Sequence, residues 1–119
     1  MAQWIFVDWL LVWIIETSSF EFDWDSGNIA KNKAKHNVST SEAESVFRIG
    51  LSLPLGVEEN SSGTKEERYG IVGRSFEGKI LQIAFVMRDE KVRIISARPA
   101  NLKERKNYEE NIRKIFKNL

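Results

Sequence analysis

The chain has 119 residues, a formal net charge of +1, no cysteine and a single histidine, His36. This length suits one compact domain that folds without metal or disulfide support. The lack of cysteine excludes disulfides, thiol catalysis and cysteine–zinc sites. With one histidine, a zinc site would need an unusual set of carboxylate partners, so we expect neither a metal site nor a cofactor. It also fits a reducing cytoplasm, where we expect the protein to act.

The charges are unevenly distributed along the chain. Residues 1–64 hold 4 Lys and Arg against 9 Asp and Glu, whereas residues 65–119 hold 14 against 8. A basic half suggests an anionic partner such as RNA, although ordinary solvated helix and strand faces produce the same asymmetry.

The first residues are unusually apolar. Every residue from Trp4 to Ile15 except Asp8 is apolar, and three of the four tryptophans lie there. The run is shorter than the roughly 20 residues that span a bilayer, and it lacks the basic start and cleavage site of a secretory signal. Its spacing fits neither a strand nor a helix clearly, so its structure stays open.

We treat residues 1–18 as an extension and residues 19–119 as a single domain. Three interpretations of the extension remain: it packs on the domain, it contacts a membrane or partner, or it is translated from an upstream start codon. We favour packing on the domain or on a second copy, with self-association through residues 4–15 and no membrane contact.

The next elements have clear boundary signals. Residues 20–24 alternate aromatic and acidic side chains, which predicts a short strand, and Asp25 then suits the N-cap of a helix to about residue 35. Asn37 tolerates the left-handed conformation that ends helices. Residues 39–42 form a capping box for a second helix, which Gly50 ends.

The rest of the chain predicts mainly strands. A short strand at residues 51–55 and a mobile loop at 56–65 precede three strands and a final helix. We place these strands at about residues 67–76, 79–88 and 91–98, and the helix at 102–118. The helix has an apolar stripe that should face the core, formed by Tyr108, Ile112, Ile115, Phe116 and Leu119. The order predicts an α+β fold with an antiparallel sheet flanked by helices.

The turns predict the strand register. Glu77-Gly78 resembles a two-residue hairpin turn, which places Arg74 opposite Leu81 and Glu67 opposite Arg88.

Asp89-Glu90 suits a second tight turn, which places Arg98 opposite Leu81 and Arg93 opposite Val86. Arg74 and Arg98 should then share one sheet face near the same end. Tyr69 and Arg93 should lie on the opposite face, and a slip of one residue would exchange the faces.

An ordered set of residues between positions 20 and 110 resembles the BrnT family. The matching elements are Phe20-Glu21-Phe22-Asp23-Trp24-Asp25, Asn32, Lys35-His36, Val38, Glu42-Ala43, Glu67-Arg68, Gly73, Arg88, Arg93-Ile94-Ile95-Ser96-Ala97-Arg98, Glu104-Arg105 and Tyr108-Glu109. The chain departs from the pattern at Asn37, where the family has glycine, and in the extension, which has no counterpart.

This resemblance implies a fold similar to the RelE-type RNase toxins. It implies an endoribonuclease toxin that cleaves RNA and arrests growth. It also implies neutralisation by a BrnA-type antitoxin with a ribbon-helix-helix part, so that the toxin reaches operator DNA only through the antitoxin.

Metal-free RNA cleavage needs cations around the phosphate as well as a proton acceptor and a proton donor. Arginine suits the first task because its guanidinium grips phosphate oxygens bidentately. Arg98 is our first candidate, assisted by Arg74 or Arg88. Arg98 is equally explained as a strand-end residue that pairs with a nearby carboxylate.

Three further residues are catalytic candidates with structural alternatives. His36 titrates near neutral pH and suits an acid or base, or it only stabilises a helix end. Glu67 suits a base, or it forms a cross-strand ion pair with Arg88. Tyr108 suits a contact with a substrate hydroxyl or base, or it packs in the core.

Several other cations are candidates for contacts with the RNA backbone that carry no sequence information. They are Lys35, Arg68, Arg74, Arg93 and Arg105. Two alternatives to an RNase stay open: a non-catalytic nucleic-acid-binding or corepressor module, and a protein-interaction module that uses the apolar extension.

Overall fold

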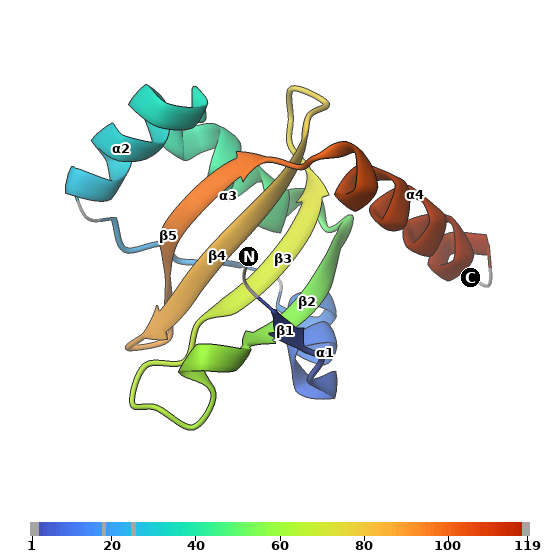
Figure 1. Cartoon of the computed structure of the whole chain (residues 1–119), viewed down its shortest axis with the longest axis horizontal. Helices are drawn as coiled ribbons and strands as arrows, with labels where there is room; N and C mark the ends of the chain where they lie inside the picture. The colour runs from blue at the N-terminus through green and yellow to red at the C-terminus, as the bar shows by residue number, and fades with distance from the viewer. Residues whose placement is uncertain (1–2, 18, 25, 118–119) are drawn as a thin grey trace.

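The computed structural model describes residues 3–17, 19–24 and 26–117. It has the predicted α+β architecture, with a five-stranded antiparallel sheet in the order β1-β2-β3-β4-β5 (Figure 1). The elements are β1 (Trp4–Ile5), α1 (Asp8–Glu16), α2 (Ser26–His36), α3 (Thr40–Ile49), β2 (Ser52–Glu58), the 3-10 turn η1 (Glu59–Ser61), β3 (Tyr69–Arg74), β4 (Ile80–Arg88), β5 (Lys91–Pro99) and α4 (Leu102–Lys117).

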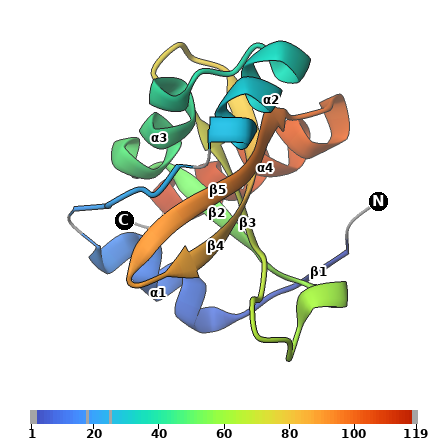
Figure 2. The ribbon, with the colours of Figure 1, turned by 90° about the vertical axis from the view of Figure 1, so that its left-hand side faces the viewer.

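Helices cover the two faces of the sheet unequally. Figure 2 shows α1 and α3 on one side of the sheet and α4 on the other. The larger core lies under α1 and α3, where Leu10 and Phe47 pack against Ile83 and Phe85. The smaller core lies under α4 around Tyr108. α4 packs near the β2 side of its face, so part of that face stays open.

The apolar extension contributes to the larger core. β1 pairs with β2, and α1 buries Leu10 and Ile14, which lie one helical turn apart. The Trp13 ring stacks on the Phe85 ring with 5.8 Å between centroids. Burying each of these side chains contributes about 2 kcal/mol. The proposed boundary at residue 18 lies outside the described residues, so that division stays a prediction.

The predicted strand at residues 20–24 is wrong as a full strand. Only Phe22 bridges β5, opposite Val92, in a parallel orientation. The Asp23 amide donates to the Val92 carbonyl, and the Val92 amide donates to the Glu21 carbonyl. The alternating aromatic residues are explained instead by Phe20 and Phe22, which pack against Phe47.

The helix boundary signals are largely confirmed. Asn37 has φ 55°, and Gly50 has φ 79° at the end of α3. The Ser39 hydroxyl accepts a hydrogen bond from the Glu42 amide at 3.1 Å, which caps α3. The Glu42 carboxylate instead accepts from the Ser75 hydroxyl. The predicted N-cap at Asp25 lies outside the described residues.

The loop predicted at residues 56–65 begins too early. β2 continues to Glu58 because β1 pairs with its end, and η1 follows directly. Gly56 has φ 125°, and a Cβ there would lie 2.0 Å from the Ile5 carbonyl oxygen. Glycine therefore serves here for close backbone approach rather than as a loop residue. The Ser61 hydroxyl further anchors the segment by accepting from the Arg68 amide.

The first predicted register is wrong by one residue. The Gly78 amide donates to the Ser75 carbonyl and the Ser75 amide donates to the Lys79 carbonyl, so the loop has three residues, with Gly78 at φ 82°. This is a type of loop in which glycine adopts the left-handed position after a turn. Arg74 consequently pairs with Ile80 rather than Leu81.

The second predicted turn is confirmed, but a bulge alters the register beyond it. Asp89 and Glu90 both have positive φ, and Arg93 pairs with Val86. The bulge between Ala84 and Phe85 then pairs Arg98 with Gln82 instead of Leu81.

The predicted faces are therefore half right. Val72 and Arg98 both lie opposite Gln82, so Arg74, two residues beyond Val72, shares a face with Arg98 as expected. Tyr69 pairs with Phe85 over the larger core. Arg93 lies on the other face with Val86, so Tyr69 and Arg93 do not share a face.

The apolar stripe of α4 is only partly buried. Tyr108 is 1% exposed and Ile112 packs beside it, whereas Ile115 is 40% exposed. The predicted stripe positions at residues 116 and 119 lie outside the described side chains. Among the described residues, no helix combines the length and apolar character needed to cross a membrane.

Candidate functional site

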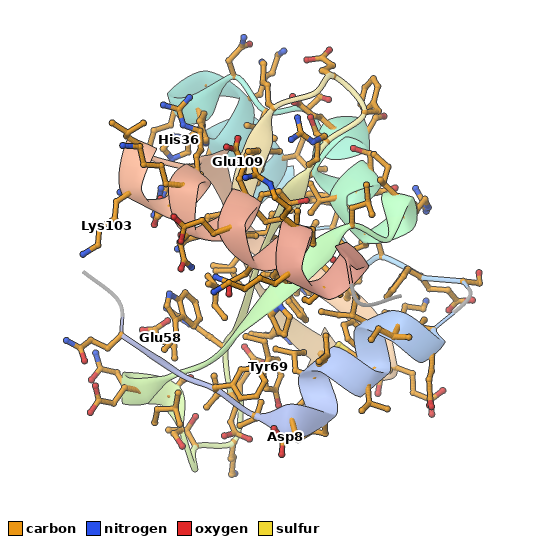
Figure 3. The ribbon with its side chains drawn as sticks, turned by 90° about the vertical axis from the view of Figure 1, so that its right-hand side faces the viewer. Asp8, His36, Glu58, Tyr69, Lys103 and Glu109 are labelled. Carbon is orange, nitrogen blue, oxygen red and sulfur yellow. The ribbon has the colours of Figure 1, made fainter. Side chains whose placement is uncertain are left out.

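A hollow of about 510 Å³ opens on the part of the sheet face that α4 leaves uncovered. We call it the arginine hollow. Figure 3 shows Glu58, one of its lining residues, between α4 and the N-terminal strand. Its polar lining groups are Glu58, Arg68, Gln82, Ser96, Arg98, Glu104 and Asn107, and its apolar ones are Trp4, Leu55, Val72, Ala84 and Ile95. The hollow therefore brings two predicted site residues, Arg68 and Arg98, onto one surface.

Arg98 is held in a bidentate ion pair. Its Nη1 and Nη2 atoms donate to the two Glu104 carboxylate oxygens at 2.9 and 2.8 Å, and Nη1 also donates to the Pro99 carbonyl at 3.1 Å. The carboxylate raises the pKa of Arg98 and, in turn, the guanidinium lowers the pKa of Glu104. The alternative explanation of Arg98, a strand-end residue paired with a carboxylate, thus describes its geometry correctly.

The start of α4 fixes the position of this ion pair. The Glu104 carboxylate accepts from the Asn101 amide, and the Asn101 side-chain oxygen accepts from the Glu104 amide, both at 2.8 Å. This reciprocal arrangement is a capping box with asparagine as N-cap. Glu104 therefore joins Arg98 to the first turn of the helix.

Arg68 is held more loosely at another part of the hollow. Its Nη1 atom lies 3.9 Å from the Glu58 carboxylate, and the Arg68 side chain is 53% exposed. An exposed pair at this distance contributes little stability. The Arg68 guanidinium can therefore exchange Glu58 for an anionic ligand with little loss of free energy.

His36 ends α2 near Arg98. Burial lowers the pKa of His36, and the charges of Lys35, Arg98 and Lys31 lower it further, in that order. The helix that ends at His36 packs on β5, the strand that carries Arg98. A lowered pKa keeps the imidazole neutral at pH 7, so it can accept a proton. The neighbouring Lys35 is exposed.

A second, shallower hollow of about 360 Å³ brings together Arg74 and Arg105. It also contains Lys79 and Glu109. Arg74 donates to the Gly78 carbonyl at 3.4 Å across the hairpin loop. Two of the predicted RNA-contacting cations are therefore neighbours, and Lys79 joins them.

Arg88 and Glu67 lie away from these hollows. Arg88 makes a bidentate pair with Glu66 at 2.8 and 3.0 Å, so the predicted pair with Glu67 is wrong. The three-residue loop explains the change, because it shifts the residue opposite Arg88 by one position. Arg88 lies six residues along β4 from the partner of Arg98, which is about 20 Å. Glu67 accepts from the Gly63 amide instead.

Two further predicted residues are also separate from the arginine hollow. Arg93 pairs with Asp23 at 3.4 Å beside the edge strand. Tyr108 is buried under α4, where its hydroxyl donates to the Leu51 carbonyl. The core-packing alternative accounts for Tyr108 in this position.

Sequence reasoning missed the polar partners in the arginine hollow. Glu104 had a readable signal, because Asn101 and Glu104 have the spacing of a capping box before an amphipathic run. Gln82, Ser96 and Asn107 had none, because their approach depends on the bulge and on where α4 packs. Within the described residues, no group of three His, Asp or Glu side chains is arranged to hold a metal ion.

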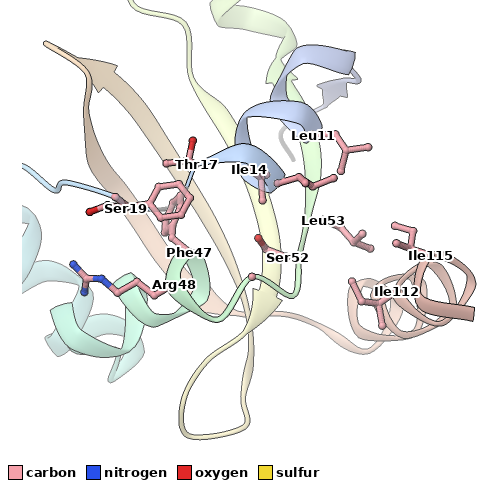
Figure 4. Close-up of a pocket in the computed structure, with 13 residues that line it drawn as sticks. Leu11, Ile14, Thr17, Ser19, Phe47, Arg48, Ser52, Leu53, Ile112 and Ile115 are labelled. Atoms are coloured by element: carbon pink, nitrogen blue, oxygen red, sulfur yellow. The ribbon is translucent and has the colours of Figure 1, made fainter. Parts of the chain in front are cut away.

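A third hollow, of about 570 Å³, is mainly apolar and lies between α1 and α4 (Figure 4). Leu11 and Ile14 of α1 line it together with Ile112 and Ile115 of α4. The buried Ser52 hydroxyl also lines it and has no hydrogen-bond partner among the described residues. This surface does not suit a polyanion, and we call it the apolar hollow.

The fold and the arginine hollow define a small α+β protein that presents paired guanidinium groups on the open face of an antiparallel sheet. The family model described as "Ribonuclease toxin, BrnT, of type II toxin-antitoxin system" matches residues 24–104. This match covers more than half of the chain, so the chain belongs to the BrnT family of ribonuclease toxins. The family resemblance inferred from the sequence is thereby confirmed.

A solved structure supports the fold independently. The crystal structure of the Brucella abortus ribonuclease toxin BrnT matches with a TM-score of 0.53 and 17% identity, covering 70% of this chain and 99% of that chain. At this identity the likeness shows the fold alone. No curated protein sequence matches the chain. The family match begins at Trp24, so β1 and α1 lie outside it.

Proposed function

We propose that the protein is a metal-independent endoribonuclease toxin that cleaves RNA and arrests growth. The observation that carries this proposal is the arginine hollow, where Arg68 and Arg98 share one open surface. The helix that ends at His36 packs on the strand that carries Arg98. Membership of a ribonuclease toxin family supports the same activity.

The proposed partners follow from the family. The chain is neutralised by a BrnA-type antitoxin with a ribbon-helix-helix part, and it reaches operator DNA only through that antitoxin. It acts in the cytoplasm, and its fold is related to the RelE-type RNase toxins.

The proposed reaction uses the ribose 2′-OH as nucleophile. Its oxygen attacks the adjacent phosphorus, the P–O5′ bond breaks, and the products are a 2′,3′-cyclic phosphate and a 5′-hydroxyl. Neutral His36 accepts the proton of the 2′-OH group, and a proton donor gives a proton to the leaving 5′ oxygen. Arg98 stabilises the extra negative charge on the phosphorane, for which its bidentate guanidinium is suited.

Purified chain incubated with naked RNA tests the proposal directly. We expect fragments that end in a cyclic phosphate, and we expect cleavage to persist in excess chelator because the reaction uses no metal. Cleavage that stops under chelator and returns with a divalent ion would contradict the metal-independent mechanism. Intact RNA under all conditions would contradict the activity itself.

A non-catalytic nucleic-acid-binding or corepressor module is the second candidate. It is favoured by the complete Arg98–Glu104 ion pair, which accounts for Arg98 without catalysis. Binding that weakens steeply with salt, without any cleavage, would select this function. A stable partner complex without RNA affinity would select a protein-interaction module.

We also propose self-association through the segment at residues 4–15. Several large apolar side chains of this segment remain exposed although α1 packs on the domain, namely Ile5, Phe6, Trp9, Val12 and Ile15. Of these side chains, Ile15 also lines the apolar hollow. Exposed apolar surface of this kind marks interaction sites in soluble proteins.

A further inference from the structure

Trp4 stands at the arginine hollow, although it comes from the apolar extension. It pairs with Glu58 in the short β1–β2 ladder, and it lines the hollow together with Arg68 and Arg98. The position of its ring is set by Gly70, because a Cβ at Gly70 would lie 2.6 Å from the Trp4 ring. The indole thus rests on bare backbone of β3.

Core packing alone does not account for this tryptophan. Trp13 of the same segment packs against the larger core, whereas Trp4 belongs to neither core cluster. Trp13 and Trp9 each contact another ring, but Trp4 has no ring partner among the described residues. Trp4 is partly exposed, so the indole contacts Gly70 and also borders the hollow.

An aromatic ring beside two guanidinium groups matches the chemistry of an unpaired nucleotide. Proteins bind single-stranded RNA by stacking bases on aromatic side chains while cations hold the backbone. A paired base in a duplex does not offer its face in this way. The hollow of about 510 Å³ also has the size of a small-ligand pocket.

We propose that Trp4 is a stacking platform for one nucleobase of single-stranded RNA, with Arg68 and Arg98 holding the adjoining phosphates. This inference rests on the proposed ribonuclease function and specifies its substrate as unpaired RNA. It gives the extension a role in substrate binding. The extension lies outside residues 24–104, which the family model matches.

The test compares the binding of a complete short 2′-O-methyl oligoribonucleotide with that of a series of the same strand. Each member of the series has one abasic position, and that position differs from member to member. The methyl groups block the nucleophile, so that binding is measured without cleavage. We expect the wild-type chain to bind the complete strand about tenfold or more tightly than the most affected abasic strand. Trp4→Leu should remove this preference while leaving the salt dependence of binding unchanged, because the arginines remain.

Trp9→Leu is the matched control. Trp9 is an exposed tryptophan of α1 that contacts Tyr69 and does not line the hollow, so this variant should keep the base preference. Thermal unfolding of each variant checks its fold. If Trp4→Leu is unfolded, Gly70→Ala gives the same test, because its methyl group displaces the ring without removing it.

The outcomes separate this inference from the proposed function. A folded Trp4→Leu or Gly70→Ala chain that keeps the full base preference overturns the stacking role. A wild-type chain that cleaves RNA yet binds complete and abasic strands equally overturns the stacking role alone. A wild-type chain that neither binds nor cleaves RNA overturns both.

Discussion

Arg98 occupies a position where structure and proposed catalysis use the same side chain. In the free chain, Glu104 fills the bidentate edge of its guanidinium, so an RNA phosphate has to displace that carboxylate at least in part. The exchange substitutes one anion for another around the same cation, and Glu104 keeps its bond from the Asn101 amide.

Arg98→Ala should lower kcat/KM for RNA cleavage by about a hundredfold or more, because it removes the proposed phosphorane contact. Arg98→Lys should retain only part of the activity, because lysine keeps the charge but loses the planar fork. Arg113→Ala, an exposed position on α4, is the control and should cleave normally. A folded, antitoxin-binding Arg98→Ala chain with full activity would remove Arg98 from the mechanism.

The Glu104 carboxylate should make stability depend on pH. Its pKa lies below the usual value of 4.5 because of the bond from Arg98, so the unfolded chain binds more protons at moderately acid pH. The stabilisation is therefore complete above about pH 4.5 and is lost as the pH falls through the lowered pKa. Urea unfolding of the wild type and of Glu104→Gln should differ near pH 6 and converge in acid. Glu110→Gln, an exposed carboxylate of α4, should match the wild type throughout, and a constant Glu104→Gln deficit down to pH 2.5 would refute this account.

At the scale of elements, the first turn of α4 connects helix capping to the arginine hollow. Asn101→Ala should destabilise the chain by about 1 kcal/mol through loss of the N-cap. It should also raise KM for RNA, because the Glu104 amide loses the Asn101 side-chain oxygen, so the first turn of α4 holds the Glu104 carboxylate and Arg98 less firmly. Asn107→Asp, on the same helix, adds a negative charge to the hollow without touching the cap. Chemical denaturation measures the loss of stability in Asn101→Ala, and steady-state kinetics measures the rise in its KM. An Asn101→Ala chain with lower stability and an unchanged KM would limit the cap to a structural role.

The local signals of the helices were predictable, whereas the register of the sheet was not. Ser39, Gly50 and Asn37 act through their immediate neighbours, so their spacing alone predicted the ends of α2 and α3. Glu77-Gly78 fits both a two-residue and a three-residue loop, and only the packing of β3 on β4 selects between them.

The candidate site depended on that same choice of register. One added loop residue replaced Glu67 by Glu66 as the partner of Arg88, and the bulge near Ala84 moved Arg98 opposite Gln82. Arg74 and Arg98 still share a face because both changes shift the register by one residue. Trp4 had no usable signal, because its place depends on where the extension packs.

At the scale of the whole molecule, the extension is part of the fold and also presents exposed apolar side chains. Deleting residues 2–18 would strip Leu10 and Trp13 from the core, so deletion does not separate folding from association. Substitutions at Val12 and Ile15, which are 49% and 70% exposed, make that distinction.

Val12→Glu combined with Ile15→Glu should convert an associated chain into a monomer without a large loss of stability, because both side chains lie outside the core. Analytical ultracentrifugation over a range of concentrations measures the change, and thermal unfolding serves as its control. Thr64→Glu, an exposed position far along the chain, adds charge without touching α1. Association that survives the double substitution would disprove a role for this face.

The ends of the sheet determine what form such an assembly takes. One outer strand, β1, is only two residues long, and the other, β5, is bridged by Phe22 beside Val92. Short or shielded outer strands offer little free backbone to a neighbouring molecule. Copies of the chain would consequently meet through side chains and separate again on dilution, and the amide exchange of the strands would be the same in the assembled and the separate protein.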